Sequence, residues 1–368
     1  MSQVEIGRRA KARMDEVNLD RTHRQIANDI GMTPDAFSRA LAGKRAFSSI
    51  ELARLADLLR ADIHWLITGE PDPYRLVVAA RHEFDFESGR RDVPGRADDE
   101  AVLQDIGLAY RQASQGSPLP PSDLPETPAT VRGRLGDGFV RRFADLLESR
   151  VGVDVVRLAG LSTSYCFSVA GRHVIVVAAT GNWFRENWSI AHELGHLAEG
   201  HIADGLSSAE RDAHEIKANA FAAELLLPAA QMQATDWAGI SAYGLASRVW
   251  EHGVSTDALA RRLAALGIPT GESVATWAAQ PTQRLLRRHW ESPSVDEGDA
   301  ITHRMDEAAT RRFPLSLQES HLTMIARGDL GKGTLAWMLG IVPEDLEVDV
   351  PADVEEVDAD VLASALGL

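Results

Sequence analysis

Two histidines separated by three residues, with a glutamate directly after the first, constrain this chain more than any other feature. They are His192, Glu193 and His196, within a stretch at 190–201 that reads Ile-Ala-His-Glu-Leu-Gly-His-Leu-Ala-Glu-Gly-His. In a helix, positions four apart lie about 40° from each other around the axis, so both imidazoles project from one face. Two neutral imidazoles so placed can bind Zn²⁺, and Glu193 can then accept a proton from water on the metal.

A catalytic zinc site of this kind needs a third ligand, and two residues are candidates. His201 lies nine positions after His192, which turns it roughly 180° away on a continuous helix, so we interpret it as a surface or helix-end histidine. Glu215 begins a second predicted helix, in which the small residues Ala218 and Ala222 permit a close approach to the first helix. Two His and one Glu leave a fourth position for water, as in catalytic zinc sites.

These two segments resemble the ImmA/IrrE family of metallopeptidases. The resemblance rests on His192-Glu193-Leu194-Gly195-His196 and on the later motif Glu215-x-x-Ala218-Asn219-x-Phe221-Ala222-Ala223-x-Leu225-Leu226-x-Pro228. It covers roughly residues 135–265 and implies that Glu215 is the third zinc ligand. It also implies a substrate, namely a helix-turn-helix repressor protein that is cleaved in a stress or mobile-element response.

Three runs rich in β-branched residues precede the histidine helix and predict strands at 153–158, 165–169 and 173–178. A sheet that leads into a metal-binding helix is the zincin arrangement, in which an extended substrate can pair with the sheet edge. Cys166 is either a thiolate ligand that silences the metal or a buried small hydrophobic residue. Four residues are candidates for stabilising an oxyanion: His173, Tyr165, Arg185 and His214.

The first 70 residues have the pattern of a small helical module. Thr33 and Pro34 are suited to the N-cap and first position of a helix that follows a turn at Gly31-Met32. The segment resembles the XRE (Cro/repressor-like) helix-turn-helix family through Ile26-Ala27-x-x-Ile30-Gly31-Met32, the second helix, and the ending Trp65-Leu66-x-Thr68-Gly69-Glu70. This resemblance implies a five-helix bundle whose second motif helix enters the major groove of DNA.

By that resemblance, Asp35, Ser38 and Arg39 face base edges, and Arg39 is the main expected contact because Arg is the commonest reader of guanine. Phosphate contacts are expected from four basic residues: His23, Arg24, Lys44 and Arg45. Residues 1–70 contain 11 Lys/Arg and 10 Asp/Glu, so the remainder of a chain of net charge −16 carries −17. Only residues 1–70 therefore have a charge balance that allows a close approach to the negatively charged phosphates of DNA. The alternative is a helical module that binds protein.

Length and composition predict a multidomain, mainly helical, cytoplasmic protein. Its 368 residues suggest two or three domains, its single cysteine fits a reducing compartment, and it contains no signal peptide or membrane-spanning run. We predict four parts: a helix-turn-helix domain at 1–70, a connecting segment at 71–134 with a Pro-rich linker at 116–130, an α+β zincin-like domain at 135–268, and a helical region at 269–368 with an acidic tail.

The sequence therefore predicts a transcriptional regulator that combines a zinc metalloendopeptidase with a module that binds a double-stranded operator, as a homodimer and without a membrane. The alternatives are a non-enzymatic transcription factor that uses the zincin fold for sensing or dimerisation, and an antitoxin-type repressor. Two hypotheses explain the fusion. Either the peptidase cuts its own chain or its dimer partner near the Pro-rich linker, or the DNA-binding module brings it to a separate repressor.

Overall fold

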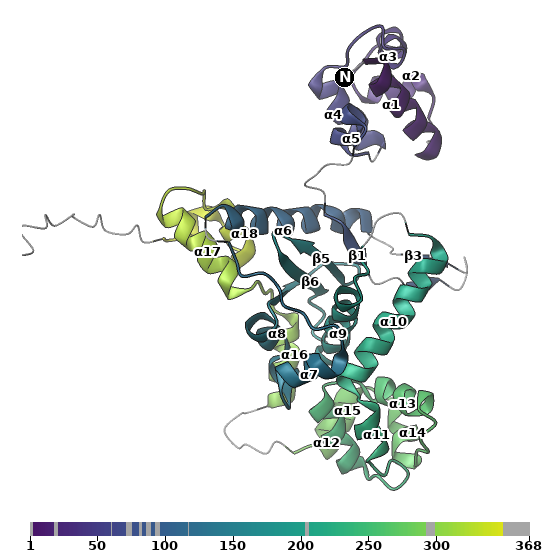
Figure 1. Ribbon diagram of the computed structural model, residues 1–368, viewed down its shortest axis with the longest axis vertical. Coiled ribbons are helices and arrows are strands. Elements are labelled where there is room, and N and C mark those ends of the chain that lie inside the picture. Colours follow the sequence, from purple (N-terminus) through teal and green to yellow (C-terminus); the bar gives the residue numbers. More distant parts are fainter. Residues whose placement is uncertain are drawn as a thin grey trace, which may run out of the picture. The chain divides into compact units, whose positions relative to one another are not determined.

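The computed structural model describes residues 3–17, 21–59, 61–70, 76–80, 83–85, 90–92, 96–116, 118–202, 206–291 and 299–348. The chain forms two compact units, residues 1–75 and residues 76–368. The first is all helical and the second combines helices with a small sheet (Figure 1). The predicted fold class, multidomain and mainly helical with an α+β part, is confirmed.

The described residues of the first unit form five helices: α1 (Gln3–Val17), α2 (His23–Asp29), α3 (Pro34–Leu41), α4 (Ser49–Leu59) and α5 (Ile63–Thr68). The hydroxyls of Thr22 and Thr33 accept backbone N–H groups and so start α2 and α3. Gly31, at φ +80°, makes the turn between these two helices. The apolar stripes of the helices meet in one core, which includes Ile26 and Phe37.

A four-stranded sheet organises the second unit, with strand order β1-β5-β6-β4. β5 (Tyr165–Val169) pairs antiparallel with β1 (Val78–Ala80) and with β6 (Arg172–Ala178), whereas β4 (Val153–Leu158) runs parallel to β6. The three strands predicted from β-branched runs are therefore present, within one residue of their expected bounds. A separate antiparallel pair is formed by β2 (Glu83–Asp85) and β3 (Arg90–Asp92).

The two faces of the sheet are covered by different helices (Figure 1). Alternate strand residues point to opposite faces, so Val156 and Val174 share one core with α6 (Arg96–Gly116). Val155 and Ile175 share the other core with α9 (Trp183–Ala198). That second core is completed by α7 (Pro128–Leu135), η1 (Phe139–Arg142), α8 (Phe143–Arg150) and α10 (Ser208–Leu226). The sheet thus packs against α9.

The described part of the chain after α10 is built mainly of helices. A cluster follows first, made of α11 (Ala229–Gln233), α12 (Ala242–His252), α13 (Thr256–Ala265), α14 (Glu272–Ala278) and α15 (Thr282–His289). Then come α16 (Ala300–Ala309), α17 (Leu315–Ala326), α18 (Gly333–Leu339) and η3 (Pro343–Asp345). Arg312 exchanges two backbone hydrogen bonds with Arg157 of β4, and Phe313 enters the core beneath α6. The predicted C-terminal region is therefore packed into the same unit as far as residue 348. This includes the start of the predicted acidic tail, at 333–348, whereas the rest of the tail, from residue 349, lies outside the described residues.

The Pro-rich stretch at 116–130, predicted as a linker at a domain boundary, lies inside this unit. Ser122 N–H donates to the Gly171 carbonyl at 3.0 Å, and Asp123 N–H donates to the Val151 carbonyl at 2.9 Å. The Arg172 guanidinium also donates to the Pro120 carbonyl at 2.9 Å. The prolines stiffen an extended segment that runs along the loops of the sheet, so composition alone was misleading here. None of the described helices combines the length and apolar character of a membrane span.

Candidate metal centre

Two helices that approach each other closely carry the candidate metal ligands. α9 begins at the N-cap Asn182, whose side chain accepts Arg185 N–H, and α10 begins at a capping box formed by Ser207 and Glu210. At their contact, a Cβ added to Gly195 would lie 3.0 Å from Ala218 Cα. Small residues at this point allow the two backbones to come together.

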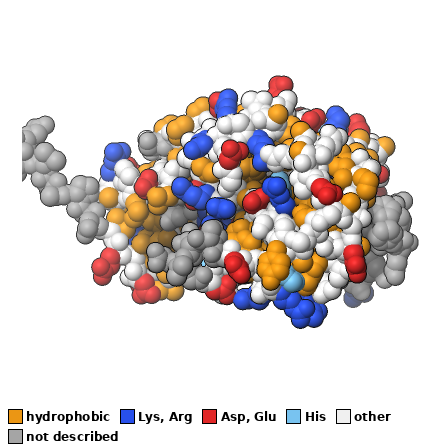
Figure 2. Space-filling view, turned by 90° about the horizontal axis from the view of Figure 1, so that it is seen from below, with side chains coloured by type: hydrophobic (Ala, Val, Ile, Leu, Met, Phe, Trp, Pro, Cys, Tyr) orange, Lys and Arg blue, Asp and Glu red, His pale blue; other side chains and the backbone are white. Residues whose placement is uncertain are grey.

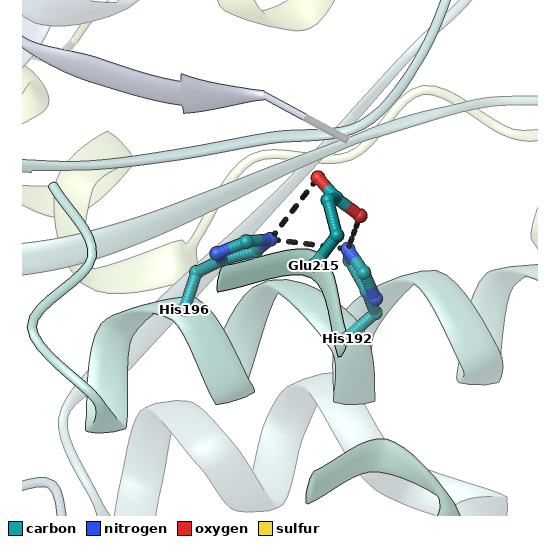
Figure 3. A group of neighbouring side chains, drawn as sticks. All are labelled: His192, His196 and Glu215. Atoms are coloured by element: carbon teal, nitrogen blue, oxygen red, sulfur yellow. Dashed lines mark hydrogen bonds and ion pairs between the residues drawn. The ribbon is translucent and has the colours of Figure 1, made fainter. Parts of the chain in front are cut away.

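His192, His196 and Glu215 lie together at this contact (Figure 3). The Glu215 oxygens are 3.3 Å from His192 Nε2 and 3.6 Å from His196 Nε2, and the two Nε2 atoms are 3.1 Å apart. All three residues are buried: the exposed fraction is 0% for His192, 3% for His196 and 1% for Glu215. Ligands bound tetrahedrally at the usual zinc distances are separated by about 3.3 Å. The three groups therefore fit a metal ion.

Each imidazole has a partner at its other ring nitrogen. His192 Nδ1 lies 3.2 Å from Asn219 Oδ1, and Asn219 Nδ2 donates to the Glu215 backbone carbonyl at 2.8 Å. His196 Nδ1 lies 3.2 Å from His201 Nδ1. Burial alone would lower the pKa of His196, but Glu215 and Glu193 raise it overall. An imidazole whose Nε2 binds a metal carries its proton on Nδ1, so such partners orient the ring.

Glu193 is fully buried, and its two carboxylate oxygens are in different situations. Oε1 accepts a hydrogen bond from Ser164 Oγ at 2.7 Å, whereas Oε2 has no hydrogen-bond partner among the described residues. Leaving a buried oxygen unpaired is costly in a stable fold and is typical of functional sites. Ser164 was not anticipated from the sequence, because a serine in the loop before β5 carries no local signal of a contact 29 residues away.

Cys166 is also buried near this centre, but it is not one of the three grouped ligands. Burial raises the pKa of its thiol well above the usual range, and the Glu193 and Glu215 carboxylates raise that pKa further. A thiol that resists deprotonation is a poor metal ligand. Of the two interpretations of Cys166, the structure favours the buried hydrophobic residue.

Of the two interpretations of His201, the helix-end residue is right, because α9 ends at Ala198, whereas only 5% of His201 is exposed, so it is not a surface residue. A continuous helix would turn His201 away from the two ligands, but α9 ends at Ala198 and Gly200 reverses the chain at φ +68°. His201 stacks on His214, with ring centroids 3.8 Å apart and an interplanar angle of 6°. Burial, followed by the nearby His214 and His196, lowers the pKa of His201 to about 4. It is not among the grouped ligands.

The other oxyanion candidates are in different surroundings. The Tyr165 hydroxyl donates to Asp99 Oδ2 at 2.6 Å, and His173 Nδ1 lies 2.7 Å from Ser168 Oγ. Arg185 instead lines a small cleft, whose walls include Ser164, the partner of the Glu193 carboxylate. Of the residues considered for stabilising an oxyanion, Arg185 is therefore the one that places a charged group beside this cleft.

The residues expected to contact DNA are mostly exposed on the first unit. Arg24, Asp35, Ser38, Arg39 and Lys44 are exposed, and the Arg39 side chain retains 59% of its accessible surface although Asp35 lies 3.9 Å away. His23 is exposed as well, whereas Arg45 is half-buried and donates two hydrogen bonds to the Glu51 carboxylate, which raise the pKa of Arg45. On the face of the molecule shown in Figure 2, acidic and basic side chains of the described residues are interspersed.

The comparison with known families agrees with the geometry of the centre. Residues 148–264 match a peptidase family described as the IrrE N-terminal-like domain. This range contains β4, β5, β6, α9 and α10, and with them every residue of the candidate centre. The chain matches no curated protein and no solved structure. The match supports a metallopeptidase domain of the ImmA/IrrE type within residues 148–264.

Proposed function

We propose that the second unit is a zinc-dependent metalloendopeptidase, and that the first unit binds operator DNA. The observation that carries the enzymatic part is the juxtaposition of a three-ligand group with an adjacent buried glutamate that has one unpaired oxygen. His192, His196 and Glu215 would hold the ion and leave a fourth position open. When bound, zinc supplies a Lewis acid that acidifies water and polarises a peptide carbonyl.

The residues around that centre divide the remaining tasks. Glu193 accepts the proton of the attacking water at Oε2, while Ser164 holds the other oxygen and so fixes the orientation of the carboxylate. Glu193 then returns the proton to the leaving amine. Asn219 orients His192. The resemblance to ImmA/IrrE peptidases leads us to propose a helix-turn-helix repressor as the protein substrate.

The enzymatic proposal is tested by comparing wild type with Glu193→Gln and Glu215→Ala. Metal analysis of purified protein should find close to one zinc per chain in the wild type and in Glu193→Gln, but little in Glu215→Ala. Proteomics of cells that express wild type or Glu193→Gln should then reveal a protein that is shortened only by the wild type. If Glu215→Ala retains zinc, the ligand assignment is wrong. If the zinc-loaded wild type cleaves nothing, the fold serves a non-enzymatic regulator.

The DNA-binding proposal rests on the exposed face of α3, where Ser38 and Arg39 lie opposite the buried Phe37 and Leu41. We propose that two copies read a palindromic site as a homodimer, with α3 in the major groove. Arg39→Ala should weaken the free energy of DNA binding by about 1–3 kcal/mol and relax specificity at one base position. Selection from random duplexes with the full chain measures this, and failure to enrich any motif would leave the first unit as a protein-binding module.

A further inference from the structure

A third histidine lies against the candidate centre without being a ligand. His201 Nδ1 is 3.2 Å from His196 Nδ1, and the two ring centroids are 5.3 Å apart at an interplanar angle of 68°. Nearly edge-on rings with two nitrogens facing each other are arranged for a hydrogen bond between the rings rather than for stacking. Both residues are buried, so each of these nitrogens needs a hydrogen-bond partner within the protein.

The end of α9 explains why His201 returns to this position. Gly200 adopts a left-handed conformation, its N–H donates to the Leu197 carbonyl at 3.2 Å, and His201 N–H donates to the His196 carbonyl at 2.9 Å. These two bonds define a Schellman motif, in which the second residue after the C-cap packs against the helix residue five positions before it. Here those two residues are His201 and His196. The conformation of the helix end therefore places His201 against His196.

A second helix holds the other side of the same ring. His201 stacks on His214, which directly precedes Glu215 in α10. Its position is thus defined by the end of one ligand-bearing helix and by the surface of the other. Such a residue can transmit a fixed geometry to the ligand that it contacts.

The roles of the nitrogens follow from what each one faces. His196 Nε2 faces His192 Nε2 and Glu215, which is the side on which a metal would bind. A metal there requires the lone pair of Nε2, so the proton of neutral His196 is on Nδ1 and needs an acceptor. The acceptor available at 3.2 Å is His201 Nδ1, which then carries its own proton on Nε2.

We propose that His201 is a positioning residue, which accepts the Nδ1–H of His196 and fixes the tautomer and ring orientation of that ligand. Asn219 has the corresponding position for His192, so each imidazole of the centre has its own acceptor. The inference rests on the proposed function only in requiring that His196 binds a metal. Loss of such a partner typically lowers metal affinity roughly 10–100-fold.

Three substitutions in the full chain separate this role from simple packing. His201→Phe keeps a flat ring on His214 but removes the acceptor, and it should weaken zinc binding roughly 10–100-fold in competition with a chelator. His201→Gln retains an acceptor and should recover most of that loss. His214→Phe preserves the stack on the far side of His201, so its zinc affinity should remain that of the wild type.

The absorption spectrum of the Co²⁺-substituted protein provides a readout that a packing defect would not produce. We expect the ligand-field bands to shift in His201→Phe and to return towards the wild-type positions in His201→Gln. Thermal unfolding of the metal-free proteins shows whether His201→Phe is folded; if it is not, the affinity and spectrum of His201→Gln against His201→Leu decide. Wild-type zinc affinity in the variants without an acceptor would overturn the role of His201 alone. Failure of the wild type to bind zinc would overturn the proposed centre as well.

Discussion

The close approach of α9 and α10 at Gly195 predicts a measurable effect of adding one methyl group there. In Gly195→Ala, the new Cβ would lie 3.0 Å from three atoms: Ala218 Cα, Ala218 O and Phe221 Cβ. This is closer than Cβ contacts normally are, so α10 has to move by a few tenths of an ångström. Overpacking of this kind costs about 1–3 kcal/mol.

The higher helix propensity of alanine raises the free energy of unfolding, whereas the crowding lowers it, so the two effects have to be separated. Alanine is better than glycine in a helix interior by about 1 kcal/mol. Gly133, within α7, is a matched control, because a Cβ added there meets no atom within 4 Å. Gly133→Ala should therefore stabilise the unit by up to about 1 kcal/mol. The difference between the two variants isolates the crowding, at about 1–3 kcal/mol.

The assay is urea unfolding of the full chain with EDTA present, so that metal binding does not contribute to stability. Tryptophan fluorescence reports on the second unit, because seven of the eight tryptophans follow residue 75. Zinc affinity is measured separately. It should fall in Gly195→Ala, since a shift of a few tenths of an ångström in the helix that carries Glu215 is at least as large as the roughly 0.2 Å tolerance of metal–ligand distances. The reasoning is refuted if Gly195→Ala is as stable as Gly133→Ala.

Two further substitutions probe the proposed catalytic base, Glu193, and the end of α9. Ser164→Ala removes the hydrogen bond to Glu193 Oε1 and should lower kcat without changing zinc content, which steady-state kinetics and metal analysis of one preparation determine together. Gly200→Ala places a side chain at φ +68° in open space, so it should destabilise the second unit by about 1–2 kcal/mol through backbone conformation alone. An unchanged urea midpoint for Gly200→Ala would contradict the assigned turn.

Periodic features were the most predictable part of the fold. The β-branched runs identified β4, β5 and β6, because residues buried on both faces of a strand leave a continuous apolar pattern. Helical spacing was also sufficient to place His192 and His196 on one face of α9. The small residues that let α10 approach were visible as Ala218 and Ala222. Each of these inferences depends on neighbours within one or two turns.

The features that were missed depend on chain reversal or on distant contacts. His201 was set aside because the helix was extended past Gly200, although a glycine at that place is itself the sign of a helix end. Ser164 reaches Glu193 only because β5 and α9 pack together in the finished fold. The roles of Asn219 and His201 as partners of the two imidazoles likewise arise from α9 and α10 jointly. No local pattern encodes such contacts.

The packing of the Pro-rich stretch bears on which chain the proposed peptidase would cut. A zincin substrate has to be extended, with backbone groups available for pairing to a strand. In residues 118–127, however, the N–H groups of Ser122 and Asp123 are bonded to the loops of the sheet, and the Ser122 hydroxyl donates to the Gly152 carbonyl. Prolines remove further donors from the same segment. Cleavage there would first require these bonds to open, which favours a separate protein as the target.

This preference predicts that the chain does not cut itself within 118–127. Wild type and Glu193→Gln are incubated with zinc and operator DNA, and intact mass is followed over time. Both should remain full length across that segment, because the backbone N–H groups of Ser122 and Asp123 are already paired with the Gly171 and Val151 carbonyls. Ser122→Pro, which removes one of these donors and the hydroxyl, should loosen the segment and serve as a control for accessibility to an added protease. A fragment that ends within 118–127 in the wild type and not in Glu193→Gln would show that the segment opens and that the enzyme processes its own chain.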